Sequence, residues 1–271
     1  LNTDDFEDIM MKLQNGYEKN GKTFMDDNAS RARKLASIRA LYKYLLGKNL
    51  ITNNPAAAFP SPKITVQPIT FLSDDEIVLL LDVITTGSGL TARQQVFSDK
   101  NRTRDMAMVY LMLSTGMRIS ECVGIDIDDI NWEENSVYLE RKGRKFQNVY
   151  FDEKCAELLS AYMDEREDMD LNEPTTALFI SRNGTRITPR SVQRMVKKYA
   201  SVAVKNKHIS PHKLRSTYAT GVYNSTGDIY LVKDALNHKS INTTARYADI
   251  SEEKRKEAST AAGNWLNNVT N

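Results

Sequence analysis

Two short segments near the C-terminal end combine side chains that could act on a phosphodiester. His212 precedes Arg215 by three positions, and His238 precedes Tyr247 by nine. Residues three apart on a helix share a face, so the imidazole and the guanidinium would be presented together. A guanidinium binds phosphate oxygens through two parallel hydrogen bonds, and an imidazole exchanges a proton near neutral pH. Taken alone, such a pair is more often a solvated histidine beside a solvated arginine.

Arg118 is a further candidate phosphate ligand, because it follows Gly116 in an otherwise apolar stretch. An arginine in such a setting needs an anionic partner. Glu121 could be that partner, or it could hold the guanidinium in place for a phosphate. Lys142 lies in the basic turn 141–145, where an exposed lysine often serves only solubility. The residues by themselves leave both alternatives open at Arg118 and at Lys142.

The elements that must position these residues are mainly helical. Residues 106–113 are apolar all round and predict a buried helix that ends at Gly116. Residues 136–151 predict a β-hairpin whose two strands are joined by the basic turn. Other helices are expected after the caps Ser73, Thr188, Ser210 and Asp228. The sequence therefore predicts a mainly α fold with a small β-sheet.

Four of the seven prolines crowd into one short interval and mark a linker. They are Pro55, Pro60, Pro62 and Pro68. Proline cannot continue a helix, so we expect this interval to run extended. Before it, residues 28–47 predict an amphipathic helix ended by Gly47. We expect a small helical domain over 1–62, a linker over 63–69 and a larger domain over 70–271.

The helix predicted over 28–47 lies in a stretch without acidic residues, between Asp27 and Asp74. A surface of one sign attracts a polyanion, because each basic side chain near a phosphate releases condensed counterions. An ordinary solvated helix face is the alternative. The residues here that we assign to DNA binding are Arg31, Arg33, Lys34, Arg39 and Lys43.

The composition excludes several classes of protein. The 271 residues include 37 basic and 35 acidic ones, a balance that by itself says nothing about nucleic acid. No apolar run could span a membrane and no secretion signal is present, so we expect a soluble cytoplasmic protein. Cys122 and Cys155 are too few for a disulfide framework or a zinc site, and we interpret both as core residues. Because the chain begins with Leu1 rather than Met, we expect a fragment of a longer protein.

Five segments, in this order, resemble the tyrosine recombinase family, especially its Xer-like and transposon-integrase branches. They are NPAAAFPSPK, TGMRISE, RKGRK, HKLRST and ALNHKSINTTARY, and they span nearly the whole chain. The resemblance implies a helical core-binding domain over 1–62, which binds DNA. It also implies an α-rich catalytic domain over 70–271 that contains the β-hairpin. The implied activity is site-specific cleavage and rejoining of DNA strands, for integration, excision or resolution.

The resemblance gives the two arginines a shared role. Arg118 and Arg215 would clamp the scissile phosphate and stabilise the charge of its pentacovalent transition state. Glu121 would support Arg118. Arg190 and Arg194, on the helix expected after Thr188, join the residues assigned to DNA binding.

The resemblance assigns the remaining candidates to proton transfer and attack. Lys142 would protonate the leaving 5′ oxygen, and His212 would assist proton transfer at the nucleophile. His238 would donate a hydrogen bond to the phosphate, and Tyr247 would attack to form a 3′ phosphotyrosyl ester. A phenol has a pKa of about 10 and needs a positive pocket and a nearby base. The covalent intermediate conserves the energy of the broken bond, so we expect neither a metal nor another cofactor.

Three features depart from the family's pattern. Asn237 stands where Gly often precedes the second histidine, and residues 85–100 predict an enlarged loop. The N-terminal domain is also short, as it would be if a helix or an arm-binding domain preceded Leu1.

Residues 251–269 predict a C-terminal helix with Ser251 as its cap and an apolar stripe. The helix could dock on its own domain. The resemblance implies instead that it packs into a neighbouring protomer, which closes a homotetramer on two DNA duplexes. The implied partners are a double-stranded DNA target site and other copies of the chain, with no membrane.

Two other functions are weighed against recombination. A type IB topoisomerase uses the same kind of phosphate pocket and tyrosine, but it relaxes supercoils as a monomer, and the compact Xer-like order argues against it. A DNA-binding protein of the same fold could have lost catalysis, but every candidate catalytic position holds a competent residue. The sequence does not indicate whether the system is a phage, a transposon or the chromosome.

Overall fold

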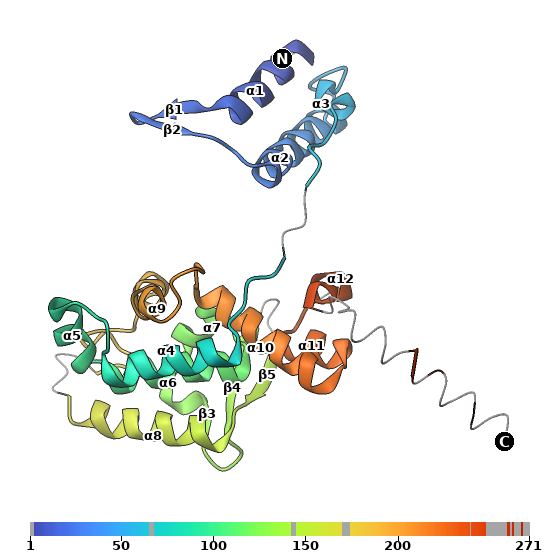
Figure 1. Cartoon of the computed structure of the whole chain (residues 1–271). Helices are drawn as coiled ribbons and strands as arrows, with labels where there is room; N and C mark the ends of the chain where they lie inside the picture. Colours follow the sequence, from blue (N-terminus) through green and yellow to red (C-terminus); the bar gives the residue numbers. More distant parts are fainter. Residues whose placement is uncertain are drawn as a thin grey trace. The chain divides into compact units, whose positions relative to one another are not determined.

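The computed structural model describes residues 3–64, 68–141, 145–169, 174–238, 240–247, 259–260, 262 and 267. The chain divides into two compact units, Leu1–Pro68 and Ile69–Asn271 (Figure 1). Within these described ranges, no helix is long and apolar enough to cross a membrane.

The first unit consists of helices and one β-hairpin. Its elements are α1 (Thr3–Asn15), β1 (Tyr17–Lys19), β2 (Lys22–Phe24), α2 (Asn28–Gly47) and α3 (Pro55–Ala58). Phe6 of α1 and Leu35 of α2 are fully buried, and the ring of Phe6 meets that of Tyr42 edge-on at 5.6 Å. The hairpin between α1 and α2 was not expected from the sequence. It is short, and Tyr17 stacks on Phe24 across it.

The helix predicted over 28–47 is confirmed by α2, which ends at Gly47. The chain leaves this helix through Asn49, whose φ is 56°. Asparagine enters the left-handed region more readily than most residues, so a glycine is not required there. The proline interval, in contrast, is not wholly extended as predicted. Pro55 begins the single turn of α3, because proline is well suited to the first helical position.

The second unit is mainly helical with one small sheet, as the sequence predicts. Its long helices are α4 (Asp74–Thr86), α6 (Arg102–Thr115), α8 (Glu153–Glu167), α9 (Pro189–Ala203) and α10 (Pro211–Thr226). Its shorter helices are α5 (Ala92–Asp99), α7 (Ile119–Gly124), α11 (Ile229–Ala235) and α12 (Ile241–Thr244), with 3-10 turns η1 (Ile127–Asp129) and η2 (Ala245–Tyr247). Its strands are β3 (Ile130–Asn131), β4 (Ser136–Arg141) and β5 (Lys145–Tyr150).

Helix α6 runs through the core of this unit and confirms the predicted buried helix. It packs against α4, α8 and α10 (Figure 1). Ala107, Met108, Leu111 and Met112 are all fully buried. The helix ends at Thr115, and Gly116 follows it with a φ of 60°. Because α6 touches so many elements, it fixes the position of the residues that follow it.

The predicted β-hairpin is present as two strands of a three-stranded antiparallel sheet in the order β3-β4-β5. Strands β4 and β5 pair from Ser136 and Tyr150 to Arg141 and Lys145. Val137, Leu139 and Val149 face the core on one side. The alternation of apolar side chains therefore sets the register of β4 and β5.

Residues 85–100 do not form the enlarged loop that we expected. Helix α5 occupies half of this stretch and begins with a capping box. The backbone N–H of Thr91 donates to Oε1 of Gln94 at 3.0 Å, and the backbone N–H of Gln94 donates to Oγ1 of Thr91 at 3.4 Å. A threonine followed three positions later by glutamine is a signal for a helix start. The signal was present in the sequence and was missed.

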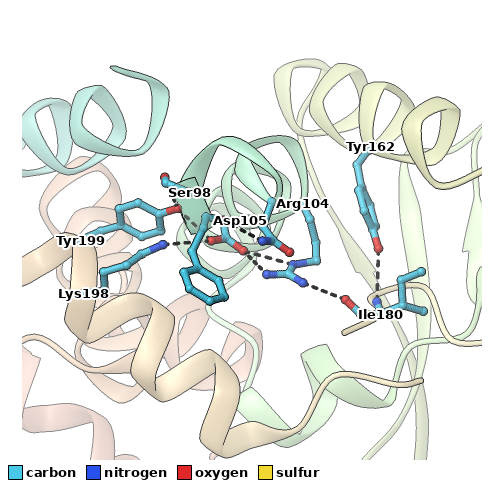
Figure 2. Close-up of polar contacts among 9 residues, drawn as sticks. Ser98, Arg104, Asp105, Tyr162, Ile180, Lys198 and Tyr199 are labelled. Carbon is cyan, nitrogen blue, oxygen red and sulfur yellow. Dashed lines mark hydrogen bonds and ion pairs between the residues drawn. The ribbon is translucent and has the colours of Figure 1, made fainter. Parts of the chain in front are cut away.

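A buried carboxylate joins α5, α6 and α9 (Figure 2). Asp105 is 1% exposed and accepts hydrogen bonds from Arg104 at 2.6 Å and from the hydroxyl of Tyr199 at 2.8 Å. The Nζ of Lys198 lies 3.7 Å from the same carboxylate. The Tyr199 hydroxyl also forms a 2.8 Å hydrogen bond with Ser98 of α5. This network anchors the unexpected helix to the core.

The two cysteines are core residues, as predicted. Cys122 and Cys155 are both fully buried and reduced. Burial raises the pKa of both thiols, because a thiolate is poorly solvated inside the protein. Both sulfurs are therefore held as neutral thiols at physiological pH.

Candidate active site

Arg118 is placed by the sharp turn between α6 and α7. Gly116 takes the left-handed conformation after α6, and Arg118 is the residue that immediately precedes α7. Glu121 accepts a hydrogen bond from the Arg118 backbone at 2.7 Å and from its Nη1 at 2.9 Å. The carboxylate of Glu121 is nearly buried, whereas the side chain of Arg118 is 39% exposed. Glu121 thus holds one edge of a guanidinium that solvent still reaches.

Arg215 lies on α10 and is 3% exposed. Its Nη1 donates to the carbonyl of Gly116 at 2.6 Å, and its Nη2 donates to the carbonyl of Leu236 at 2.5 Å. Burying a guanidinium is costly unless its donors are satisfied. These two bonds tie the turn before α7 to the end of α11. The Arg215 side chain therefore holds the segment that carries Arg118 and the segment that carries His238.

His238 follows a tight turn at the end of α11. Asn237 has a φ of 48°, the left-handed conformation for which glycine is often used. The asparagine that replaces the family's usual glycine at this position therefore leaves the turn intact. The backbone N–H of His238 donates to the carbonyl of Lys233 at 2.9 Å. Its Nδ1 lies 2.9 Å from Oγ1 of Thr244, a fully buried residue. Thr244 orients the ring, and the sequence did not indicate this role.

The candidate arginines are among the charges that shift the pKa values of His212 and His238. Burial, followed by the charges of Arg215 and Arg118, lowers the pKa of His238 to about 4. The pKa of His212 is also lowered, first by partial removal of its ring from solvent and then by the charges of Lys213, Arg215, Arg246 and Arg118. The two arginines act on both rings, so the fold brings all four side chains into one positive region. His212 itself is exposed on the first turn of α10.

Tyr247 closes the 3-10 turn η2 and is half-buried. Its ring packs against a small apolar cluster formed by Ala219, Val232 and Leu236. Leu236 is also the residue whose carbonyl accepts from Arg215. The tyrosine thus rests on the same turn that holds the buried guanidinium.

Two parts of the predicted site lie outside the described residues. Lys142, which follows β4 in the chain, is one of them. The other is almost all of the helix predicted over 251–269, of which the structure describes only positions 259, 260, 262 and 267. The roles of Lys142 and of this helix stay predictions.

The basic residues assigned to DNA binding fall into two groups in the first unit. One group makes contacts within the unit. Arg31 donates to the side chains of Gln14 and Asn28, and Lys34 forms an ion pair with Asp26. Arg39 donates to the backbone carbonyls of Ala56 and Phe59. Arg39 therefore fixes the α3 segment against α2. Arg33 and Lys43 are exposed on α2.

In the second unit, Arg190 and Arg194 are both exposed on α9. Thr188 caps this helix by accepting from the backbone of Ser191 at 3.2 Å, and Pro189 is its first residue. The predicted start of the helix is thus confirmed, while the role of its arginines stays a prediction.

A sequence model described as the phage integrase family matches residues 70–254. The tyrosine recombinase XerC of Syntrophus aciditrophicus (strain SB) is 33% identical over 225 residues, which cover 81% of this chain and 69% of that protein. XerC of Bacillus subtilis (strain 168) is 29% identical over 253 residues, which cover 92% of this chain and 77% of that protein.

Solved structures with the same fold include recombinases bound to DNA. The XerH site-specific recombinase bound to its difH substrate matches with a TM-score of 0.71 and 22% identity, over 96% of this chain and 70% of that one. The Tn1549 transposon integrase in complex with a circular intermediate DNA matches with a TM-score of 0.73 and 15% identity. The match covers 96% of this chain and 85% of the integrase chain. At these identities the likeness concerns the fold.

The matched domain and the XerC relatives together show that this chain belongs to the phage integrase family of tyrosine recombinases. Its enzyme class is accordingly that of a site-specific tyrosine recombinase. The comparisons do not favour a type IB topoisomerase or a catalytically silent DNA-binding protein.

Proposed function

We propose that this enzyme cleaves and rejoins double-stranded DNA at a specific site through a 3′ phosphotyrosyl intermediate formed by Tyr247. The observation that carries the proposal is the positive region that Arg118 and Arg215 create around His212 and His238, with Tyr247 packed on Leu236, whose carbonyl accepts from Arg215. A phosphodiester is the substrate that such a region would stabilise, because two guanidiniums can share its charge.

In the proposed step, Oη of Tyr247 attacks the phosphorus and the bond from phosphorus to the 5′ oxygen breaks. The phenol proton passes to His212, and Lys142 gives a proton to the leaving 5′ oxygen. Arg118 and Arg215 bind the non-bridging oxygens, where charge accumulates in the transition state. Attack by the free 5′ hydroxyl on the phosphotyrosyl ester reverses the step. No external energy source is needed, because one ester replaces another.

The lowered pKa values of the histidines fit this division of work. At pH 7 both rings are neutral, so the imidazole of His212 can accept a proton from the phenol. The pKa of His238, about 4 in the free protein, would rise when a phosphate brings negative charge beside it. His238 can then donate a hydrogen bond to that phosphate, with Thr244 fixing the ring through Nδ1.

The DNA-binding surface is proposed to include exposed basic residues of both units. These are Arg33 and Lys43 of α2 and Arg190 and Arg194 of α9. Arg31, Lys34 and Arg39 are committed to contacts within the first unit, so they would act mainly by shaping α2. Solved relatives of the same fold hold DNA, namely a difH substrate and a circular intermediate.

The active assembly is proposed to be a homotetramer on two DNA duplexes. The helix predicted over 251–269 would pack into a neighbouring protomer, and four such head-to-tail contacts close into a ring. The segment follows Tyr247 closely in the chain. Docking of the helix would therefore help to position the nucleophile and would couple cleavage to assembly.

A covalent trapping experiment tests the proposal. The full chain is mixed with a nicked suicide duplex carrying its target site, and the covalent adduct is measured on a denaturing gel. Tyr247→Phe should abolish the adduct and leave duplex binding nearly unchanged, since it removes a single oxygen. Tyr230→Phe, at a tyrosine that is 69% exposed on α11, should retain the adduct. An adduct that persists in Tyr247→Phe and disappears in Tyr230→Phe would reassign the nucleophile.

A further inference from the structure

A cavity lies beside α5, α6 and α9, and none of the described candidate catalytic residues lines it. Its volume is about 470 Å³. The charged residues that line it are Arg93, Arg104, Arg182, Arg194, Lys198 and Asp105. Phe97, Ile187 and Met195 provide apolar wall, and Ile187 and Met195 are buried. Cavities of roughly 300–1,000 Å³ with an apolar lining and a few polar groups are typical of small-molecule sites.

The charges of this cavity are unbalanced, because five cationic side chains face one carboxylate. Asp105 is already engaged by Arg104 and by the Tyr199 hydroxyl, with Lys198 close by (Figure 2). Within the described ranges, no carboxylate forms an ion pair with Arg93, Arg182 or Arg194. An anion entering the cavity would meet uncompensated positive charge on several sides.

The lining also offers a flat platform. The guanidinium of Arg182 lies over the ring of Phe97, with 5.1 Å between Cζ and the ring centroid. A guanidinium is planar and stacks on flat rings as well as binding phosphate oxygens. Ile187 and Met195 extend this surface with apolar atoms. The cavity therefore combines groups suited to a phosphate with groups suited to a planar ring.

We propose that this cavity binds a phosphorylated small molecule with a planar ring, of the nucleotide class. Arg93 and Arg194 would hold the phosphate, and the ring would lie against Arg182 and the apolar wall. Burial lowers the pKa of the Lys198 ammonium, and a bound phosphate would offset that effect. A polypeptide partner fits less well, because a stable protein interface needs roughly 800 Å² from each side rather than one compact cavity.

The nucleotide could come from solution or from the DNA itself, since both present a phosphate next to a base. Arg194 belongs to the predicted DNA-binding residues, whereas Arg93 and Arg182 do not. The cavity is separate from the proposed chemistry, because it lies near the first turn of α6 and Gly116 lies past the last turn. The eleven positions from Asp105 to Gly116 correspond to about 16 Å of helix axis.

Calorimetric titration of the full chain with AMP at low ionic strength tests the proposal, with adenosine and inorganic phosphate as partial ligands. AMP should bind more tightly than either partial ligand. Arg182→Gln and Arg93→Gln should each weaken AMP binding about tenfold, because each removes a charge-assisted contact. Lys197→Gln, at an exposed lysine of α9 outside the lining, should change it less than twofold. All three residues are exposed, and circular dichroism checks that each variant is folded.

Repeating the titration with a saturating DNA duplex distinguishes the two sources. Unchanged AMP affinity supports a free nucleotide as the ligand, and displacement of AMP supports a nucleotide unit of the duplex. Failure of AMP to bind at millimolar concentration would overturn the proposal. Equal losses in Arg182→Gln and Lys197→Gln would overturn it too, because they would indicate unspecific attraction. These results are independent of the Tyr247 adduct, so the two proposals fail separately.

Discussion

Replacing Gly116 by alanine adds only one methyl group, but it should disturb the candidate active site strongly. Gly116 has a φ of 60°, which costs an alanine roughly 1–2 kcal/mol. A Cβ at this position would stand 2.2 Å from Cδ1 and 2.8 Å from Cγ of Tyr218. Relief of such an overlap requires movement of a ring on α10, the helix that carries Arg215.

The expected magnitude follows from adding these two effects. Overpacking of a filled region costs about 1–3 kcal/mol, so together with the backbone strain Gly116→Ala should lower the free energy of unfolding by about 2–5 kcal/mol. The shift should also move the Gly116 carbonyl, which accepts from Arg215 at 2.6 Å. We therefore expect DNA cleavage to fall further than stability alone would explain.

Urea unfolding and the covalent trapping assay, both at 25 °C, measure the two effects. Gly221→Ala is the matched control, since Gly221 lies within α10 and an added Cβ meets no heavy atom within 4 Å. An alanine in a helix interior stabilises by about 0.5–1 kcal/mol relative to glycine. The reasoning fails if Gly116→Ala is as stable as the unmodified chain, or if it cleaves at the same rate while folded.

Three more predictions concern the pH dependence, the buried network and the C-terminal segment. The pKa of His238 is about 4 when folded and about 6.5 when unfolded, so the unfolded chain takes up the proton first as the pH falls. Stability should therefore decline between pH 6.5 and 4, and His238→Gln should make that decline shallower in urea unfolding at several pH values; an unchanged slope would contradict the assignment. Tyr199→Phe removes a buried hydroxyl bonded to Asp105 and Ser98 and should cost about 1–3 kcal/mol, against no change for the exposed Tyr230→Phe. Deleting 251–271 should preserve binding to a single site but sharply reduce synapsis and recombination, and a truncated chain that assembles and recombines at full rate would refute exchange of the helix.

Much of the fold could be predicted because local signals were strong. The capped starts of α4, α9 and α11, the apolar α6 and the alternating strands β4 and β5 all depend on nearby residues, and each is present. The β-hairpin of the first unit was not expected, because its strands are too short for a clear alternation. Helix α5 was not predicted because its sequence is mostly polar and shows no clear apolar stripe, although a capping box marks its start.

The residue types of the candidate site could be predicted from the sequence, but the contacts that hold these residues in place could not. Spacing suggested that His212 and Arg215 share a helix, and they do. Nothing local indicated that Arg215 is buried, or that its partners are the carbonyls of Gly116 and Leu236, which are distant in sequence. The contact between His238 and Thr244 likewise depends on how α11 and α12 meet. Contacts of this kind are set by how the helices pack rather than by sequence spacing.

The burial of both cysteines makes the protein well suited to fluorescence work. Thiol-reactive dyes attack the thiolate, and Cys122 and Cys155 are shielded from reagent and held protonated. A single cysteine introduced at an exposed position would carry the dye alone, with neither native cysteine removed. Pairs of singly labelled chains, one with a donor and one with an acceptor, would then report in real time when copies of the enzyme gather on DNA.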